Sequence, residues 1–316
     1  MVSLLGLDPA TYSVSPLHGP DRTFRETNCY VDIWIELLHA RGIPAESVMP
    51  FAFTITFEGD QWTFFKPPTE DLEGLYGIDV HEMQLYRPTI DHLVEQLSAG
   101  RTMIIEADSF YMPDTAATAY KKAHVKSSIA IESIDVAGER LRYFHGAGYY
   151  QLSGEDFRGI FRLGRPFSDD VLPPYAEIVR FDAGPTLTGG DLRCAAKKAL
   201  ARQLKRCPQQ NPWKMFGCRL TKDLPGLLAG TEAGYHAYAF ATVRQCGAAY
   251  ELAKSFVEWL APEDKETAGA LGRQVAGAKS LLFKLARRRP FDVNPAIAQL
   301  AADWEAALEG LVRISR

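Results

Sequence analysis

The 316-residue sequence has no long apolar run and no basic leader, the features that mark membrane and secreted proteins. No stretch approaches the roughly 18 apolar residues that a transmembrane helix needs. The first ten residues contain no lysine or arginine, and Asp8 and Pro9 interrupt their short apolar segment, so a signal peptide is not expected. The sequence therefore predicts a cytoplasmic protein that does not bind membranes.

Cysteine is scarce, and the common nucleotide-binding and protease motifs are missing. The five cysteines, at positions 29, 194, 207, 218 and 246, are widely spaced and form no C-x-x-C pair. Neither a disulfide framework nor a four-ligand zinc site is therefore expected. The chain also has no Walker A loop and no GxGxxG, HExxH or GxSxG sequence. We expect no metal and no tightly bound cofactor.

Charge is distributed unevenly along a chain that has an ordinary hydrophobic content of 47%. Residues 1–184 contain 15 Lys and Arg against 27 Asp and Glu, whereas residues 185–316 contain 20 against 12. Because the change falls in the breaker-rich segment 183–190, we predict two domains, 1–184 and 185–316. The basic half is either a set of solvated helix faces or a docking surface for an acidic partner. A pI of about 6.0 and the absence of a recognised motif argue against nucleic acid.

Hydrophobic periodicity predicts an α+β first half and an all-helical second half. In the first half it indicates helices over 28–41 and 88–99, strands over 48–57, 61–65 and 102–107, and a β-hairpin with arms 125–134 and 140–152. A tight turn at 136–138 would place His124 opposite Tyr150 and His145 opposite Ile129. Alanine-rich helices near 191–206, 220–228, 232–260, 266–288 and 295–314 suggest an antiparallel bundle.

Cys29 is the most informative candidate, because it lies in the first turn of the first predicted helix, with Thr27 or Asn28 as the N-cap. The positive end of the helix dipole favours an anionic thiolate there. Papain-like enzymes place their nucleophile in this way, with a histidine on a following sheet. A cysteine in a largely apolar helix is more often a packing residue, and we assign the other four cysteines to packing. Asn28 is a further candidate for orienting the site.

Two histidines of the predicted hairpin are candidates for the general base. His124 opens the first arm and His145 lies on the second; either could be the base, and we favour His124. Asp108, which follows a buried strand, and Asp114, in the next loop, are candidates for orienting a histidine. Gln61 could donate an oxyanion hydrogen bond, although a hairpin turn explains it more simply.

A longer pattern covers residues 20–180 in six stretches: RETNCYVDIWIELLHARGI (25–43), FEGDQWTFFKPPTEDLEGLYGIDV (57–80), EADSFYMPDT (106–115), HVKSSIAI (124–131), YFHGAGYYQLSGEDF (143–157) and LPPYAE (172–177). Together they resemble a bacterial family of unknown function that is often encoded beside non-ribosomal peptide synthetase genes. That family is in turn remotely similar to the N-terminal domain of the butirosin biosynthesis protein BtrH. The latter is a papain-like acyltransferase that moves an acyl group from a carrier-protein thioester to an amine.

The resemblance implies a papain-like catalytic domain at 1–184, followed by the helical domain. It implies Cys29 as the nucleophile, His124 as the base and Asp108 in the strand–loop that forms the pocket. The third position of the butirosin-type pattern, an aspartate, falls here on His145, and Gly146 stands where the family often has asparagine.

These residues and the charge asymmetry predict an acyl- or aminoacyltransferase in natural-product biosynthesis. The donor would be the phosphopantetheine thioester of an acidic carrier protein docked on the basic half. The acceptor would be a small-molecule or peptidyl amine or thiol. Two alternatives remain open: a cysteine peptidase, amidase or peptide cyclase on the same scaffold, and a non-catalytic scaffold that binds carrier proteins.

Overall fold

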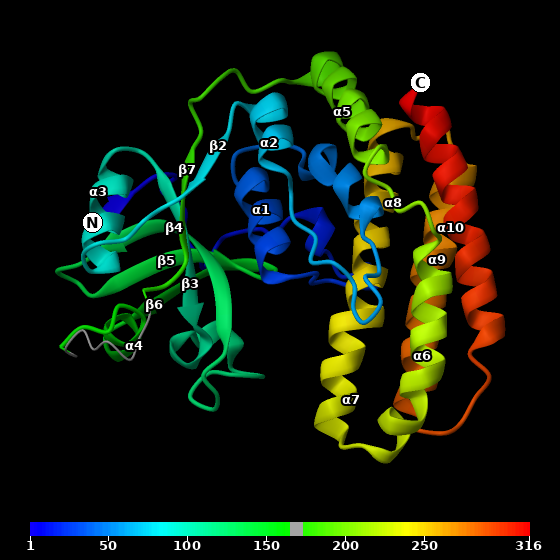
Figure 1. Ribbon diagram of the computed structural model, residues 1–316. Coiled ribbons are helices and arrows are strands. Elements are labelled where there is room, and N and C mark those ends of the chain that lie inside the picture. Colours follow the sequence, from blue (N-terminus) through cyan, green and yellow to red (C-terminus); the bar gives the residue numbers. More distant parts are fainter. Residues whose placement is uncertain (165–172) are drawn as a thin grey trace. The chain divides into compact units, whose positions relative to one another are not determined.

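A computed structural model describes residues 1–164 and 173–316 and divides the chain into two compact units (Figure 1). The first unit consists of Met1–His18, Asn28–Ala45 and Leu72–Thr186. The second consists of Gly19–Thr27, Glu46–Asp71 and Leu187–Arg316. The second unit therefore includes two segments of the first 71 residues as well as the C-terminal helices.

The first unit is built on one antiparallel sheet. Its strands are β1 (Val2–Ser3), β2 (Asp79–Glu82), β3 (Thr102–Asp108), β4 (Lys126–Asp135), β5 (Arg140–His145), β6 (Gly148–Ser153) and β7 (Ala176–Arg180). They lie in the order β2-β7-β3-β4-β5-β6, and β1 pairs with the end of β4. The mixed α+β fold expected from the sequence is confirmed.

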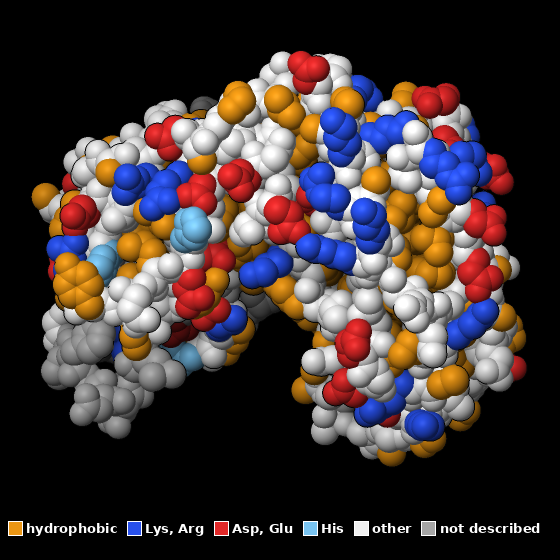
Figure 2. Space-filling view, turned by 45° about the horizontal axis from the view of Figure 1, so that its top comes forward, with side chains coloured by type: hydrophobic (Ala, Val, Ile, Leu, Met, Phe, Trp, Pro, Cys, Tyr) orange, Lys and Arg blue, Asp and Glu red, His pale blue; other side chains and the backbone are white. Residues whose placement is uncertain are grey.

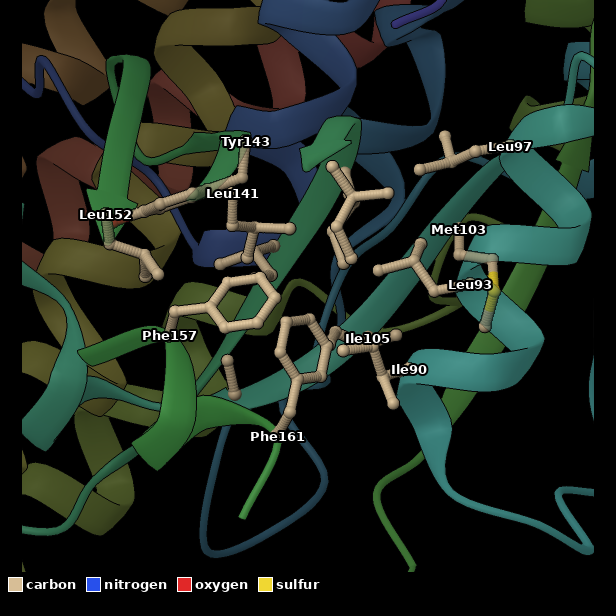
Figure 3. Close-up of a cluster of buried hydrophobic side chains, with 14 of the residues drawn as sticks. Ile90, Leu93, Leu97, Met103, Ile105, Leu141, Tyr143, Leu152, Phe157 and Phe161 are labelled. Carbon is tan, nitrogen blue, oxygen red and sulfur yellow. The ribbon is translucent and has the colours of Figure 1, made fainter. Parts of the chain in front are cut away.

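Helices pack on both faces of this sheet. The helical elements of the first unit are η1 (Pro16–His18), α1 (Cys29–His39), α3 (Thr89–Ser98), η3 (Ser109–Tyr111), η4 (Pro113–Thr115) and α4 (Glu155–Ile160). Helix α1 contacts β4, β5 and β6. The opposite face carries an apolar core shared by α3, α4 and the strands, shown in Figure 3, whose central members are Leu93, Met103, Ile105, Tyr143 and Phe157.

The expected helix at 28–41 is confirmed, and the local sequence explains its bounds. Asn28 is extended at φ −131°, and its side chain accepts a hydrogen bond from the Val31 backbone N–H at 2.9 Å, so it is the N-cap of α1. At the other end, Gly42 adopts a left-handed φ of +70°, which stops the helix. The expected helix at 88–99 and the expected strand at 102–107 are also present, as α3 and β3.

The strands expected at 48–57 and 61–65 are wrong. Most of the first segment lies in a run of 3₁₀ turns, η2 (Ala45–Thr54), and the only β pairing in the region is an isolated bridge between Phe57 and Trp62. Pro50 lacks the backbone N–H that a strand ladder needs. The apolar side chains of the run are nevertheless buried, so burial produced a strand-like pattern without a strand.

The expected hairpin is a three-stranded meander. The chain turns again at Gly146 and Ala147, so the second arm divides into β5 and β6. The pairing of Ala130 with Phe144 gives the register expected for His145. The expected proximity of His124 to Tyr150 is wrong, because Tyr150 pairs with Tyr143 on β5 instead.

The second unit contains the expected antiparallel helices. They are α5 (Gly189–Leu204), α6 (Pro212–Ala229), α7 (Glu232–Ala239), the π-helical turn η5 (Phe240–Arg244), α8 (Gln245–Leu260), α9 (Lys265–Ala286) and α10 (Asn294–Ser315). Helix α9 packs between α8 and α10, which also contacts α5 and α6. Helix α2 (Thr69–Tyr76) spans the sequence position at which the chain passes from the second unit back to the first.

Hydrogen bonds hold the two N-terminal segments in the second unit. The Glu251 carboxylate on α8 accepts from the backbone N–H groups of Thr23 and Phe24, at 2.8 and 2.7 Å. Asp71, which is fully buried, accepts from Arg202 and Gln203 on α5. Because these partners lie far apart in sequence, hydrophobic periodicity alone does not predict the pairing.

Candidate functional site

Cys29 is the first residue of α1 and lies against strand β4. Its thiol donates to the Ser128 hydroxyl with an Sγ–Oγ distance of 3.7 Å, and the side chain is partly exposed. The neighbouring Tyr30 donates its hydroxyl proton to the Glu177 carboxylate on β7 at 2.6 Å. The Asn28 cap and this bond fix the start of the helix. The positive end of the helix dipole lies at the start of α1, and this is where the structure places the Cys29 thiol.

His124 and Asp108 form a hydrogen-bonded pair where β3 ends and β4 begins. His124 Nδ1 donates to Asp108 Oδ2 at 2.6 Å, and the imidazole stacks on Phe110 with ring centroids 4.4 Å apart. The other carboxylate oxygen of Asp108 accepts from the Phe110 backbone N–H. The His124 side chain is 68% exposed, and its Nε2 has no hydrogen-bond partner among the described residues. Asp108 thus holds the ring while Nε2 remains able to accept a proton.

This pair lies at the rim of a cavity of about 500 Å³. The polar part of the wall includes His124, Asp108, Glu106 and Tyr111, and Glu106 is also bonded to Lys126. The apolar part comes from the start of α3, from β3, from the end of α4 and the residues after it, and from the segment before β7. It includes Pro88, Ile105, Ala107, Ile160, Phe161, Leu163, Pro173 and Pro174. A mainly apolar cavity with a few convergent polar groups is the usual form of a small-molecule site.

His145 lies in a separate polar cluster with Asp114. Its Nδ1 donates to Asp114 Oδ2 at 2.5 Å, and its Nε2 is 2.7 Å from the Ser127 hydroxyl. Tyr143 also donates to the Asp114 carboxylate. Both ring nitrogens of His145 are therefore occupied within the protein.

The structure groups the predicted residues as two histidine–aspartate pairs and does not hydrogen-bond Cys29 to either histidine. Side chains of successive strand residues point to opposite faces, so Ser128 lies on the α1 face and Ser127 on the other. His145 belongs to the Ser127 face. Gln61 is an exposed residue of the second unit, where its carbonyl closes a turn by accepting from the Glu58 N–H at 2.9 Å.

A buried histidine escaped the sequence analysis. His18 has no exposed surface and lies between two carboxylates of α1, with Nε2 3.3 Å from Asp32 and Nδ1 bonded to Glu36. Burial lowers the pKa of His18, but hydrogen bonds to Asp32 and Glu36 outweigh burial and raise it from 6.5 to about 9. The signal in the sequence was the acidic pair at i and i+4 inside an otherwise apolar helix, which requires a buried cationic partner.

The remaining cysteines differ in their surroundings. Burial raises the pKa of the Cys207 thiol to about 12 and that of the fully buried Cys246 well above its usual value. Cys194 and Cys218 are exposed. No group of three or more His, Cys, Asp or Glu in residues 1–164 and 173–316 is arranged to hold a metal ion. Within the same ranges, no helix has the length and apolar character to cross a membrane.

The protein thus has an α+β unit, with a candidate nucleophile at the start of a helix, and a helical unit. Comparison with known protein families also finds two domains in the chain. The DUF1839 N-terminal domain matches residues 13–181, and the DUF1839 C-terminal domain matches residues 190–313. The chain therefore belongs to the DUF1839 family, whose function is unknown. No curated protein matches the chain. The links to peptide synthetase genes and to the butirosin protein stay predictions; Leu172, in one of the six resembling stretches, lies outside the described residues.

Proposed function

We propose that this protein is a papain-like, cysteine-dependent acyltransferase that accepts an acyl group from a thioester on Cys29 and passes it to an amine or thiol. The observation that carries the proposal is the position of Cys29. Cys29 begins the buried helix α1, which packs on the antiparallel sheet. His124 lies just before β4, one of the strands that α1 contacts. A thiol nucleophile and its base must come within hydrogen-bond reach of one another, and this arrangement brings both residues to the same sheet.

His124 suits the role of base better than His145. Asp108 engages Nδ1 of His124 and leaves Nε2 to take the Cys29 proton, whereas both nitrogens of His145 are engaged and Ser127 occupies its Nε2. Cys29 and His124 are not hydrogen-bonded in this structure. The proposal requires them to approach in the substrate complex, as catalytic hydrogen bonds often do.

The reaction would proceed in two balanced steps. The Cys29 proton passes to His124, and the thiolate attacks the thioester carbonyl carbon. The bond to the donor sulfur then breaks, and the donor thiol leaves with the proton from His124. In the second step the acceptor amine or thiol gives its proton to His124, attacks the acyl carbon and releases Cys29. Exchange between thioesters is nearly isoenergetic, so positioning supplies most of what the enzyme must provide.

The 500 Å³ cavity suits an acyl group of modest size. Its apolar wall includes Ile105, Ala107 and Phe161, and the His124–Asp108 pair stands at its rim. Ile105 and Ala107 belong to the core on the sheet face opposite α1, so the cavity meets the proposed Cys29 chemistry only at the His124–Asp108 rim. Burying an apolar chain of this kind contributes roughly 25 cal/mol for each Å² removed from water.

For the donor we propose an acidic carrier protein that docks on the second unit. Lys and Arg side chains gather over this part of the molecule (Figure 2). On α5, Arg202 and Arg206 are already paired with Asp71 and Glu70. Lys198 and Lys205 are exposed and form no ion pair among the described residues, so they remain available to a partner.

Arginines 287–289 fit a docking role less well. Arg288 has a left-handed φ of 50° and donates to the carbonyl oxygens of Leu228 and Gly230 at the end of α6. It therefore satisfies helix-end carbonyls inside the unit. Charge reversal at Lys198 and Lys205 is the sharper test of docking.

The transferase proposal is tested by intact mass after incubation with acyl-loaded carrier proteins and simple acyl thioesters. We expect an acyl-sized mass gain that fragmentation assigns to Cys29 and that is absent from this position in Cys29→Ala. Because Cys194 and Cys218 are exposed, the matched control is Cys194→Ala/Cys218→Ala, which should still be acylated. Turnover of amide substrates without any thioester would instead indicate a peptidase or amidase. Absence of adduct and of thioester consumption across the panel would contradict the proposal and favour a scaffold.

A further inference from the structure

Three side chains on the face of the sheet remote from Cys29 form an unbroken hydrogen-bonded series. The Ser127 hydroxyl is 2.7 Å from His145 Nε2, and His145 Nδ1 is 2.5 Å from Asp114 Oδ2. They come from three separate elements, β4, β5 and η4. Serine, histidine and aspartate joined in this order and through these atoms are the arrangement that activates a serine hydroxyl.

The Asp114 carboxylate determines which nitrogen of His145 carries the proton in this series. An ionised carboxylate can only accept, so the Asp114 oxygens receive the Nδ1 proton of His145 and the hydroxyl proton of Tyr143. Burial, together with Asp114, raises the pKa of Tyr143 far above its usual range, so Tyr143 remains a donor. When Nδ1 carries the proton that Asp114 accepts, Nε2 is left to accept from the Ser127 hydroxyl. That is the tautomer that a general base needs.

Ser127 is the direct strand neighbour of a residue in the cavity wall. It pairs directly with Ala107 on β3, and directly paired residues of an antiparallel sheet point to the same face with Cβ atoms about 5 Å apart. Ala107 and Ile105 both line the cavity wall. Ser127 retains 9% of its surface, and the His145 side chain retains 14%. Ser127 does not itself line the cavity, and the strand pairing places its side chain beside that of the wall residue Ala107.

We propose that Ser127 is a second nucleophile of this protein, activated by His145 and Asp114, and that it accepts small apolar acyl groups from esters or thioesters. The Ser127 proton passes to His145 Nε2 while Oγ bonds to the carbonyl carbon. The bond to the leaving oxygen or sulfur breaks, and the leaving group takes the proton from His145. Water, deprotonated by the same nitrogen, then releases the acid and restores the serine.

The test is labelling by an alkyl fluorophosphonate, in which Ser127 Oγ displaces fluoride at phosphorus and His145 takes the proton. It is done in the Cys29→Ala chain, so that it is independent of the proposed thiol chemistry. We expect one adduct on the tryptic peptide 127–140, which fragmentation assigns to Ser127. Ser128→Ala is the matched control, because it removes the adjacent hydroxyl on the opposite face, and it should label normally.

Asp114→Asn should slow the labelling by about 100-fold or more, since the wrong tautomer of His145 is then favoured. Ser127→Ala should abolish it. If Ser127→Ala does not fold, the site assignment in the parent chain still decides the question. No adduct on the folded chain, an adduct on another residue, or an unchanged rate in Asp114→Asn would each overturn the proposal and leave the series a structural network.

Discussion

Replacement of His124 by alanine is expected to slow acylation of Cys29 by about 10²–10⁴-fold, the usual contribution of a positioned general base. Among the described residues, Nε2 of His124 has no hydrogen-bond partner, and the side chain stands at the rim of the cavity. The rate measured is that of acyl-enzyme formation before the steady state, with an acyl thioester in excess and no acceptor. The fold should be unaffected, because the side chain is 68% exposed and lies outside the core.

His81 supplies a matched control for this experiment. It is a second exposed histidine of the first unit that forms a carboxylate pair, with Nε2 2.7 Å from Asp79, and it does not line the cavity. His81→Ala should acylate at the wild-type rate. Asp108→Ala should lower the rate more than Asp108→Asn, since an amide oxygen can still accept from Nδ1 and orient the ring. A His124→Ala rate within about threefold of wild type would remove His124 from the mechanism.

Replacement of His18 by leucine is expected to destabilise the first unit by about 3–5 kcal/mol, the usual cost of removing one partner of a buried charge pair. Asp32 and Glu36 would keep their burial on α1 and lose the imidazolium between them. His39→Leu, at the C-terminal residue of α1, is the matched control. His39 is only partly buried and contacts the carbonyl of Ser13, so its loss should cost little.

The same cluster predicts a pH dependence of stability. The folded-state pKa of His18 is about 9 and the unfolded value is 6.5, so protonation stabilises the fold. The full contribution, of about 3 kcal/mol, is present below pH 6.5 and is lost as the pH rises through 9. Hydrogen exchange of the α1 amides, followed from pH 6 to 10 after correction for intrinsic exchange rates, reports it locally. A protection free energy in wild type that is as flat as in His18→Leu would contradict the assignment.

Sequence patterns predicted the elements whose local signals and burial agree. A cap at Thr27 or Asn28, the breakers Gly42 and Gly100 and the apolar periodicity gave α1, α3 and most bundle helices nearly to their observed bounds. Helix α6 begins at Pro212, well before the helix expected at 220–228. The buried strand β3 was equally clear. Between residues 48 and 57 the sequence pattern predicted a strand, but the buried apolar side chains lie mostly on 3₁₀ turns that contain Pro50. Whether a side chain is buried depends on what surrounds it. An apolar sequence pattern therefore does not by itself show whether the backbone is a strand or a 3₁₀ helix.

By itself the sequence determined the α+β and helical halves, the start of α1 at Cys29, and the short set of histidines and aspartates from which a site can be built. Only the tertiary structure decided which of them meet. It pairs His124 with Asp108 and joins His145 to Asp114 and Ser127. It also buries His18 against Asp32 and Glu36. Hydrogen-bond partners are set by strand register and by which face each side chain occupies, and a shift of one residue exchanges the faces. That is why neighbouring serines, 127 and 128, belong to different polar clusters.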